Sequence, residues 1–368
     1  MKKIIACVLS MLLVASLVGC SKPNENEGGD VNGGTEETVK IGVSMPTQSL
    51  QRWNQDGSNM KADLEKAGYS VDLQYAGDND IPTQVSQIEN MISSGVEVLV
   101  IAAIDGSALT EVLKGAVDKD IPVISYDRLI MNSEAIRYYA TFDNYKVGTI
   151  QGEYIKDSLK LDEESDTTYN IELVTGAPDD NNVNFFFGGA MDVLNPYIES
   201  GKVVVKSGQT EKAEVATPNW STEESQKRFE NIISSVGYGP EGEKLDAVLC
   251  SNDSTSIGVT NALVAAGYTA ENFPVTTGQD CDKTAVKNMI KGLQSMSVFK
   301  DTRTLANKVV GMVDAIIKGE EPEINDTTTY DNGVKVVPSY LCDPVFADSS
   351  NYSEILIDSG YYTEADIK

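Results

Sequence analysis

From Val39 onward, the chain alternates short apolar runs with amphipathic stretches of helical length. In the first half, apolar runs begin near residues 39, 71, 96 and 122, and helices are predicted over 52–67, 82–94 and 107–117 between them. This spacing is typical of βαβ units, and continuous apolar strands are typical of a parallel sheet that is covered on both faces. The pattern therefore predicts an α/β fold that contains a doubly wound, Rossmann-like lobe.

A second series of the same kind follows the segment YYATFD at 138–143. Helices are predicted over 144–159, 184–199, 222–235, 254–266 and 283–291, and they alternate with the apolar runs NIELVTG, KVVVKSG, LDAVLCSND, PVTTGQD and SMSVFKD. This pattern predicts a second doubly wound lobe. Because no long flexible linker separates the two series, we expect a cleft at their junction, where small ligands commonly bind.

The N-terminus has the features of a targeting segment. Lys2 and Lys3 precede an apolar stretch over 4–18, and the run LVGC that ends at Cys20 resembles a bacterial lipobox. We therefore predict a signal peptide over 1–19, a lipidated Cys20 and a flexible tether over 20–38. The alternative is an uncleaved membrane helix, but the apolar stretch is shorter than the about 20 residues that a span needs. An extracytoplasmic protein that a lipid anchors to the membrane is expected.

Composition excludes several classes of function. The chain has 29 Lys and Arg against 56 Asp and Glu, and the resulting charge of −27 repels nucleic acid, which is not expected as a partner. The chain has no histidine, which excludes histidine general bases, Ser-His-Asp triads and imidazole-bound zinc. We expect no enzyme activity, no metal site and no cofactor.

Export also bears on the cysteines. Cys7 lies in the predicted signal peptide and Cys20 is the predicted lipidation site, so Cys250, Cys281 and Cys342 remain. These three are odd in number and lack CxxC spacing, so buried free thiols are favoured over a bridge between Cys250 and Cys281.

Polar side chains follow the apolar runs of both series, at the points where the predicted strands end. The carboxyl ends of parallel strands face the ligand crevice of an open α/β sheet, so these side chains should converge on one place. Capping of the following helices is the alternative for each of them taken alone. The residues are Asp105, Asp127, Arg128, Asn252, Asp253, Gln279 and Asp280.

The two tryptophans of the chain lie at the ends of elements, one in each series. Trp53 follows the first strand, and Trp220 directly precedes the capping box that starts at Ser221. Either side chain alone could fill a core. If both face the cleft, two indoles can cover the apolar faces of a flat ring while charged and amide groups bind its edge. A pyranose sugar has this combination of surfaces.

Several segments together resemble the multiple-sugar and xylose branch of the periplasmic sugar-binding proteins that serve ABC transporters. These segments are VKIGVSMPTQSLQRWNQDG, VLVIAAIDGSAL, IPVISYDRLI, YYATFDNYKVG, APDDNNVNFFFGGAMDVL, SNDSTSIG, TTGQD and NGVKVVPSYL. The resemblance, which runs from Val39 to the C-terminus, implies a type I fold in which three crossing strands join two lobes. The crossings are expected near 143–146, 299–302 and 334–340. Lobe one would then comprise 39–144 plus 301–335, and lobe two 145–300 plus 336–368.

The resemblance also implies a set of ligand-binding residues. They are Arg52, Trp53, Asp127, Arg128, Asp180, Asn182, Trp220, Asn252, Asp280 and Lys300. Asp105 and Asn144 are weaker candidates, because they can equally shape a strand end or the hinge, and Phe186 either lines the pocket or fills the core. The ligand implied is one aldopyranose such as glucose, galactose, arabinose or xylose.

The function implied is that of a monomeric substrate-binding lipoprotein that delivers a monosaccharide to the permease of an ABC importer. A sugar sensor that feeds a chemoreceptor or a sensor kinase is the alternative, and an exported glycosidase is less favoured. A DNA-binding regulator of the same fold would need a basic helical module at its N-terminus. This chain has a targeting segment and an acidic tether there instead.

Overall fold

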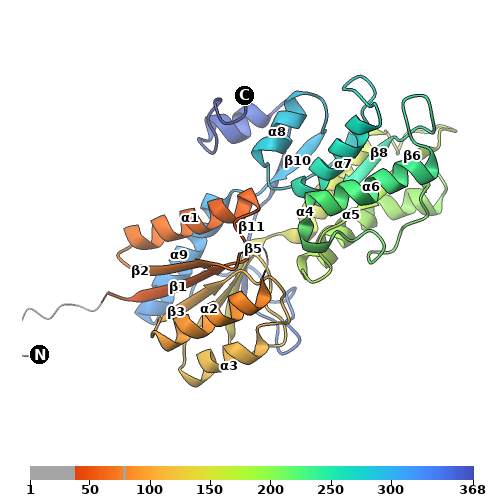
Figure 1. Cartoon of the computed structure of the whole chain (residues 1–368). Coiled ribbons are helices and arrows are strands. Elements are labelled where there is room, and N and C mark those ends of the chain that lie inside the picture. The colour runs from red at the N-terminus through yellow and green to blue at the C-terminus, as the bar shows by residue number, and fades with distance from the viewer. Residues whose placement is uncertain (1–37, 78–79) are drawn as a thin grey trace, which may run out of the picture. The chain divides into compact units, whose positions relative to one another are not determined.

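The computed structural model describes residues 38–77 and 80–368. The predicted signal peptide, Cys20 and all of the predicted tether before residue 38 lie outside the described residues. Residues 38–368 form one compact unit, which contains two separate parallel sheets (Figure 1). Among the described residues, no helix is long and apolar enough to cross a membrane.

The first sheet has six strands, all parallel to their neighbours. They are β1 (Lys40–Met45), β2 (Ser70–Tyr75), β3 (Val98–Ile101), β4 (Val123–Tyr126), β5 (Ile136–Phe142) and β11 (Ser339–Cys342). Their order across the sheet is β11-β5-β4-β3-β1-β2. The order reverses at β1, and an open α/β sheet forms its ligand crevice beside such a reversal, at the carboxyl ends of the strands.

Helices cover both faces of this sheet and complete the first lobe. Helices α1 (Gln51–Lys66) and α9 (Thr302–Lys318) lie on one face, and α2 (Ile81–Ser93) and α3 (Thr110–Asp118) lie on the other (Figure 1). Each face has its own apolar core, with Ile41 and Val100 in one and Leu99 and Ile101 in the other. Consecutive residues of β3 therefore alternate between the two cores, as strand geometry requires.

The second lobe repeats this plan around a smaller sheet. Its parallel strands are β6 (Tyr169–Val174), β7 (Val203–Val205), β8 (Ala247–Cys250) and β9 (Val275–Thr276), in the order β7-β6-β8-β9. A parallel bridge from Gln279 to Val298 joins β10 (Met296–Phe299) to this sheet. The antiparallel strand β12 (Val345–Asp348) pairs with β10.

Helices again lie on both faces. Helices α4 (Asn144–Ser158) and α5 (Asn182–Glu199) bury one face, and α6 (Thr222–Val236) and α7 (Asp253–Ala265) bury the other. Helix α8 (Lys283–Ile290) packs with β10 and the C-terminal segment, which contains a π-helical turn over Ser353–Asp358. A 3₁₀ turn over Pro218–Trp220 precedes α6.

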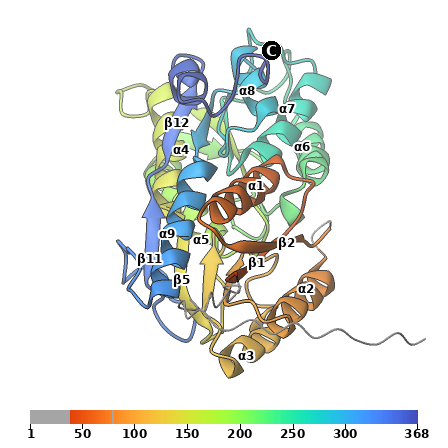
Figure 2. The ribbon, with the colours of Figure 1, turned by 90° about the vertical axis from the view of Figure 1, so that its left-hand side faces the viewer.

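The fold class predicted from the sequence is confirmed, but one boundary is wrong. Residues 336–368 were expected in the second lobe, with the third crossing near 334–340. Strand β11 instead pairs with β5 in the first sheet, because Cys342 and Leu341 pack into the cores on its two faces. After β11, two residues, Asp343 and Pro344, lead the chain to β12 in the second lobe (Figure 2). The chain also passes between the sheets from Phe142 to Asn144 and from Phe299 to Thr302.

The prediction of free thiols is confirmed, and the alternative bridge between Cys250 and Cys281 is wrong. Cys250, Cys281 and Cys342 are all buried and free in the described part of the chain. Burial raises the pKa of each of these thiols, so they remain protonated and unreactive.

Helices α4 and α5 approach each other at glycines. A Cβ atom on Gly189 would lie 2.2 Å from the carbonyl oxygen of Tyr145, and one on Gly148 would lie 2.0 Å from the carbonyl oxygen of Phe186. Any side chain at these positions would push the two backbones apart. Gly188 has no described atom within 4 Å of its Cβ position, so it provides a matched control on the same helix.

We therefore expect Gly189→Ala to lower the free energy of unfolding by about 1–3 kcal/mol, because the added methyl overpacks the helix contact. Gly188→Ala should raise it by up to about 1 kcal/mol, because alanine favours the helix. Urea unfolding followed by circular dichroism measures both. Equal effects of the two substitutions would contradict this account of the contact.

Candidate functional site

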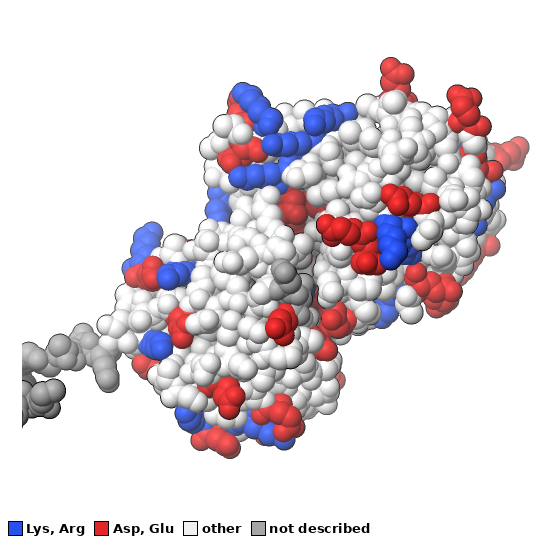
Figure 3. All heavy atoms as spheres, in the orientation of Figure 1, with Lys and Arg blue, Asp and Glu red and all other residues white. Residues whose placement is uncertain are grey.

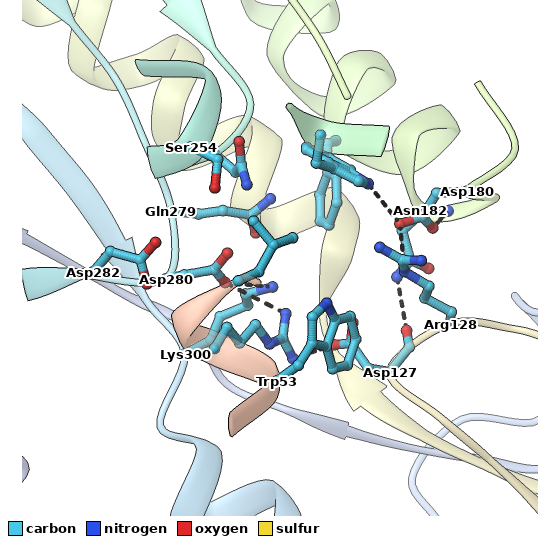
Figure 4. A pocket seen from close by; sticks show the side chains of 15 residues that line it. Trp53, Asp127, Arg128, Asp180, Asn182, Ser254, Gln279, Asp280, Asp282 and Lys300 are labelled. Carbon is cyan, nitrogen blue, oxygen red and sulfur yellow. Dashed lines mark hydrogen bonds and ion pairs between the residues drawn. The ribbon is translucent and has the colours of Figure 1, made fainter. Parts of the chain in front are cut away.

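Side chains from the carboxyl ends of strands in both sheets surround one pocket between the lobes (Figure 4). The pocket encloses about 420 Å³ of space, including the part open to solvent. Its lining residues are Leu50, Arg52, Trp53, Asp127, Arg128, Asp180, Asn182, Phe186, Trp220, Asn252, Ser254, Gln279, Asp280, Asp282 and Lys300.

The first lobe contributes Asp127 from a tight turn that follows β4. Its φ of 58° lies in the left-handed region, and the N–H of Arg128 donates to the carbonyl oxygen of Tyr126 across the turn. Such a conformation is costly unless other contacts hold it. Here the Asp127 carbonyl oxygen lies 2.6 Å from Tyr139 Oη, and accepts hydrogen bonds from Thr141 Oγ1 at 3.0 Å and Asn182 Nδ2 at 2.7 Å.

The second lobe holds Trp220 in a similarly constrained place. Its φ is 55°, and a Cβ atom on Gly176 would lie 2.0 Å from its indole ring, so only glycine fits beneath the ring. Trp220 Nε1 donates to Asp180 Oδ2 at 3.2 Å. The ring also meets Phe186 edge to face, with centroids 6.2 Å apart. These contacts fix one aromatic wall of the pocket.

Both indoles line the pocket while their other atoms pack against the core of their own lobe. The guanidinium carbons of Arg52 and Arg128 each lie 5.1 Å from the centroid of the Trp53 ring, within the range of a cation–π interaction. The sequence left core filling and pocket lining as alternatives for the tryptophans. Each tryptophan does both.

Arg52 is the centre of an ion-pair network that joins the lobes. Its Nε lies 2.9 Å from Asp56 Oδ2, its Nη2 2.5 Å from Asp127 Oδ2, and its Nη1 3.4 Å from Asp280 Oδ1. Lys300, at the end of β10, reaches the same Asp280 oxygen at 3.0 Å. Asp127 belongs to the first lobe and Asp280 to the second, so Arg52 contacts both.

A second ion pair crosses between the lobes. Arg128 Nε lies 3.0 Å from Asp180 Oδ2, and Arg128 Nη1 donates to the carbonyl oxygens of Ala103 and Ile104 at 3.1 and 3.2 Å. The guanidinium is therefore fixed to the end of β3 in the first lobe while it binds a carboxylate of the second.

This network sets the protonation of the carboxylates. Burial alone would raise the pKa of Asp127, but the charges of Arg52, Lys300 and Arg128 outweigh it and hold the pKa below its ordinary value. Burial raises the pKa of Asp56 to about 6, against the opposing charge of Arg52. Asp127 is therefore a charged hydrogen-bond acceptor at neutral pH.

The charges of the pocket nearly balance. Three cationic side chains, Arg52, Arg128 and Lys300, each contact a carboxylate that also lines the pocket. An ionic ligand would have to displace one of these partners and leave it buried without compensation, which is costly. An uncharged ligand that offers hydroxyl groups can bind to the same atoms without breaking the pairs.

Asn252 combines both roles that the sequence left open. Its Oδ1 accepts a hydrogen bond from the N–H of Thr255 at 2.9 Å and so caps α7, in a full capping box. Asn252 also lines the pocket. A cap at a strand-to-helix junction and a position at the pocket wall are therefore compatible.

The structure brings together the ten principal candidates from the sequence and Phe186, but two weaker candidates do not line the pocket. Asp105 lies in the turn before α3, where its Oδ1 accepts the N–H of Ser107 at 2.7 Å. Asn144 is buried at the start of α4, where its Nδ2 donates to Thr141 Oγ1 at 3.3 Å. Each of these side chains therefore forms a hydrogen bond with a residue two or three positions away in its own segment.

Four lining residues were absent from the predicted ligand-binding set: Leu50, Ser254, Gln279 and Asp282. Gln279 was nevertheless one of the strand-end side chains that were expected to converge on the crevice. Ser254 and Asp282 each follow a predicted ligand residue by two positions, so local backbone geometry was needed to place them. Among residues 38–77 and 80–368, no group of three or more Cys, Asp and Glu side chains is arranged to hold a metal ion.

Comparison with known proteins identifies the family to which this architecture belongs. A model of the periplasmic binding protein domain matches residues 41–321. The chain belongs to the periplasmic binding protein family. The resemblance to its multiple-sugar and xylose branch is confirmed. The chain is 50% identical over 330 residues to the multiple sugar-binding periplasmic receptor ChvE of Rhizobium radiobacter, with 89% of this chain and 92% of ChvE covered.

Two further members extend the comparison. The D-xylose-binding periplasmic protein of Escherichia coli is 36% identical over 329 residues, with 89% of this chain and 92% of that protein covered. A crystal structure of an ABC transporter solute-binding protein from Clostridium phytofermentans, with bound β-D-glucose, is 62% identical. It superposes with a TM-score of 0.86 and covers 89% of this chain and all of its own.

The turn at Asp127 yields a test of how this binding-protein fold holds its pocket. Tyr139→Phe removes the hydroxyl beside the Asp127 carbonyl, and we expect the free energy of unfolding to fall by about 1 kcal/mol. Tyr138→Phe is the control, because the Tyr138 hydroxyl donates to Glu321 at the exposed surface and its loss should change stability by less than about 0.5 kcal/mol. Thermal and urea unfolding measure both, and an equal loss in the two variants would contradict the role given to Tyr139.

Proposed function

We propose that this protein binds one uncharged monosaccharide between its two lobes and delivers it unchanged to a membrane partner. The observation that carries the proposal is a single pocket in which two indoles, three cations paired with carboxylates, and two asparagines converge. Indole rings cover the C–H faces of a pyranose, and the charged and amide groups hydrogen-bond its equatorial hydroxyls.

The interaction energies are adequate for this role. A hydrogen bond to a charged group contributes about 1.5–3 kcal/mol net, and an aromatic contact adds to this through buried area. A few such bonds reach the about −8 kcal/mol of micromolar binding. No covalent step is needed for capture, and the ion-paired carboxylates Asp127, Asp180 and Asp280 are suited to accept hydrogen bonds.

The names of the relatives support an aldopyranose as the ligand. The solute-binding protein of Clostridium phytofermentans holds β-D-glucose, and other relatives are named for multiple sugars and for D-xylose. We therefore infer that glucose is a ligand and that galactose, arabinose or xylose are further candidates.

We infer that the protein acts outside the cytoplasm as a monomer, attached by lipid at Cys20, and that an ABC permease receives the sugar. The signal-like N-terminus and the periplasmic relatives support this location. Acidic side chains are spread over both lobes on the face drawn in Figure 3, in keeping with a charge of −27, so nucleic acid is not proposed as a partner. A sensor that feeds a chemoreceptor or kinase differs only in the receiving partner.

Closure of the two lobes over the sugar would tell the membrane partner that a sugar is bound. Arg52 with Asp280 and Arg128 with Asp180 are contacts between lobes, so the pocket is complete only when the lobes are closed. A sugar that touches both lobes binds the closed form more strongly and shifts the population toward it. The partner would recognise the closed form.

Titration with monosaccharides tests the proposal. We expect glucose to bind with micromolar affinity and to change the intrinsic fluorescence, because both tryptophans of the chain line the pocket. Trp53→Ala and Trp220→Ala should each weaken binding by at least about 1 kcal/mol. Phe346→Ala removes an aromatic side chain that is 40% exposed and outside the pocket, and it should leave the affinity unchanged.

Calorimetry that finds no binding of any of the four sugars at millimolar concentration would refute the proposal. A glycosidase is distinguished by its products: oligosaccharides and aryl glycosides should remain intact after prolonged incubation with the protein at high concentration.

A further inference from the structure

Two polar side chains of the pocket have acceptor atoms that no described residue uses. Gln279 Oε1 and Asp282 Oδ1 are buried and lack a hydrogen-bond partner among residues 38–77 and 80–368, and both residues line the pocket. A buried acceptor without a partner costs about 1–3 kcal/mol. In a binding pocket, a ligand that donates hydrogen bonds removes this cost.

Asp282 occupies a position where an aspartate usually caps a helix, but its side chain does not do so. It directly precedes α8, and its carboxylate accepts no capping hydrogen bond from the described residues of that helix. Its backbone is nevertheless fixed: its N–H donates to Asp253 Oδ2 at 2.8 Å, and the next N–H, of Lys283, donates to Gln51 Oε1 at 3.2 Å. The carboxylate is thus held at the pocket wall by contacts of the main chain.

The backbone between the two residues explains why both face the same space. Asp280 and Cys281 have φ values of 93° and 51°, so the chain leaves the extended path that would alternate side chains between two faces. The carbonyl oxygen of Gln279 is held by the N–H of Asp253 at 3.0 Å. Figure 4 shows Gln279 and Asp282 on the same side of the pocket, opposite Arg128 and Asp180.

The surroundings of Asp282 include groups of both signs from every adjoining segment. Asp280 and Asp253 lie on its own lobe, and the charges of Arg52 on α1 and of Lys300 at the end of β10 act on it. Tyr362 of the C-terminal segment is near enough for the charge of Asp282 to raise its pKa. Burial and the charge of Asp280 raise the pKa of Asp282 to about 7, against the opposing charges of Arg52 and Lys300.

We propose that Asp282 and Gln279 accept hydrogen bonds from hydroxyl groups of the bound sugar and thereby select among sugars. This inference rests on the function proposed above and goes beyond the ligand set that the family resemblance implies. Buried acceptors, charged ones most of all, discriminate against ligands that lack the donor, because the acceptor is then left buried and unpaired.

A dependence of affinity on pH follows. A hydroxyl that donates to Asp282 stabilises its charged form, so the pKa of Asp282 is lower in the complex than in the free protein. Affinity is then complete above about pH 7 and falls as the pH drops below that value, because the free protein must first release a proton to bind.

Calorimetric titration of the purified full chain with glucose and with each monodeoxyglucose tests the inference. For the wild type, we expect at least one monodeoxyglucose to bind about 10- to 100-fold more weakly than glucose through loss of the bond to Asp282. The penalty is the ratio of the dissociation constant of the monodeoxyglucose to that of glucose. In Asp282→Asn, the penalty for that same sugar should shrink at least about fivefold. Gln279→Ala should reduce the penalty for a monodeoxyglucose in the same way if Asp282→Asn does not fold. Asp358→Asn, an exposed carboxylate outside the pocket, should leave all the penalties unchanged.

The pH profile separates a ligand contact from a structural role. The affinity of the wild type for glucose should fall between pH 7.5 and 5.5, and this fall should be clearly smaller in Asp282→Asn, in which Asp56 still titrates in this range. Unchanged deoxyglucose penalties in both Asp282→Asn and Gln279→Ala, or the same pH profile in Asp282→Asn and the wild type, would overturn the inference. In that outcome, glucose binding by the wild type would still support the proposed function, whereas loss of all sugar binding by the wild type would refute both.

Discussion

The pocket depends on the ion pairs that the Arg52 guanidinium forms with three carboxylates. The guanidinium contacts carboxylates from α1, from the turn after β4 and from the loop after β9. A buried cation needs such partners, because its desolvation costs several kcal/mol otherwise. Asp56 and Asp127 belong to the same lobe as Arg52, and Asp280 adds a third carboxylate from the second lobe. One side chain therefore connects the carboxylates of both lobes.

The pairing of cations with carboxylates also explains how a very acidic protein forms a pocket with little net charge. The pocket gathers three of the chain's cations among its buried carboxylates, so the excess negative charge remains on the surface. Hydrogen bonds to charged groups are strong, and each cation of the pocket is already paired with a carboxylate. A polar and uncharged molecule is the ligand that benefits most from this arrangement.

The architecture and most of the pocket could be predicted from the sequence, because strand ends of a doubly wound sheet converge by topology alone. Asp127, Asn252 and Asp280 were identified in this way, and the family resemblance added Asp180 and Asn182. Strand β11 was misassigned, since its short apolar run is equally compatible with either sheet and only its register with β5 decides. Asp282 was missed because an aspartate before a helix normally indicates a cap. The left-handed backbone conformations of Asp280 and Cys281, which turn Asp282 toward the pocket, cannot be read from these residue types.

The connection from β11 to β12 has a mechanical consequence. Two residues, Asp343 and Pro344, separate a strand of the first sheet from a strand of the second, and the proline ring fixes one of the few free torsions between them. A link this short cannot lengthen, so it limits how far the end of β11 and the start of β12 can separate.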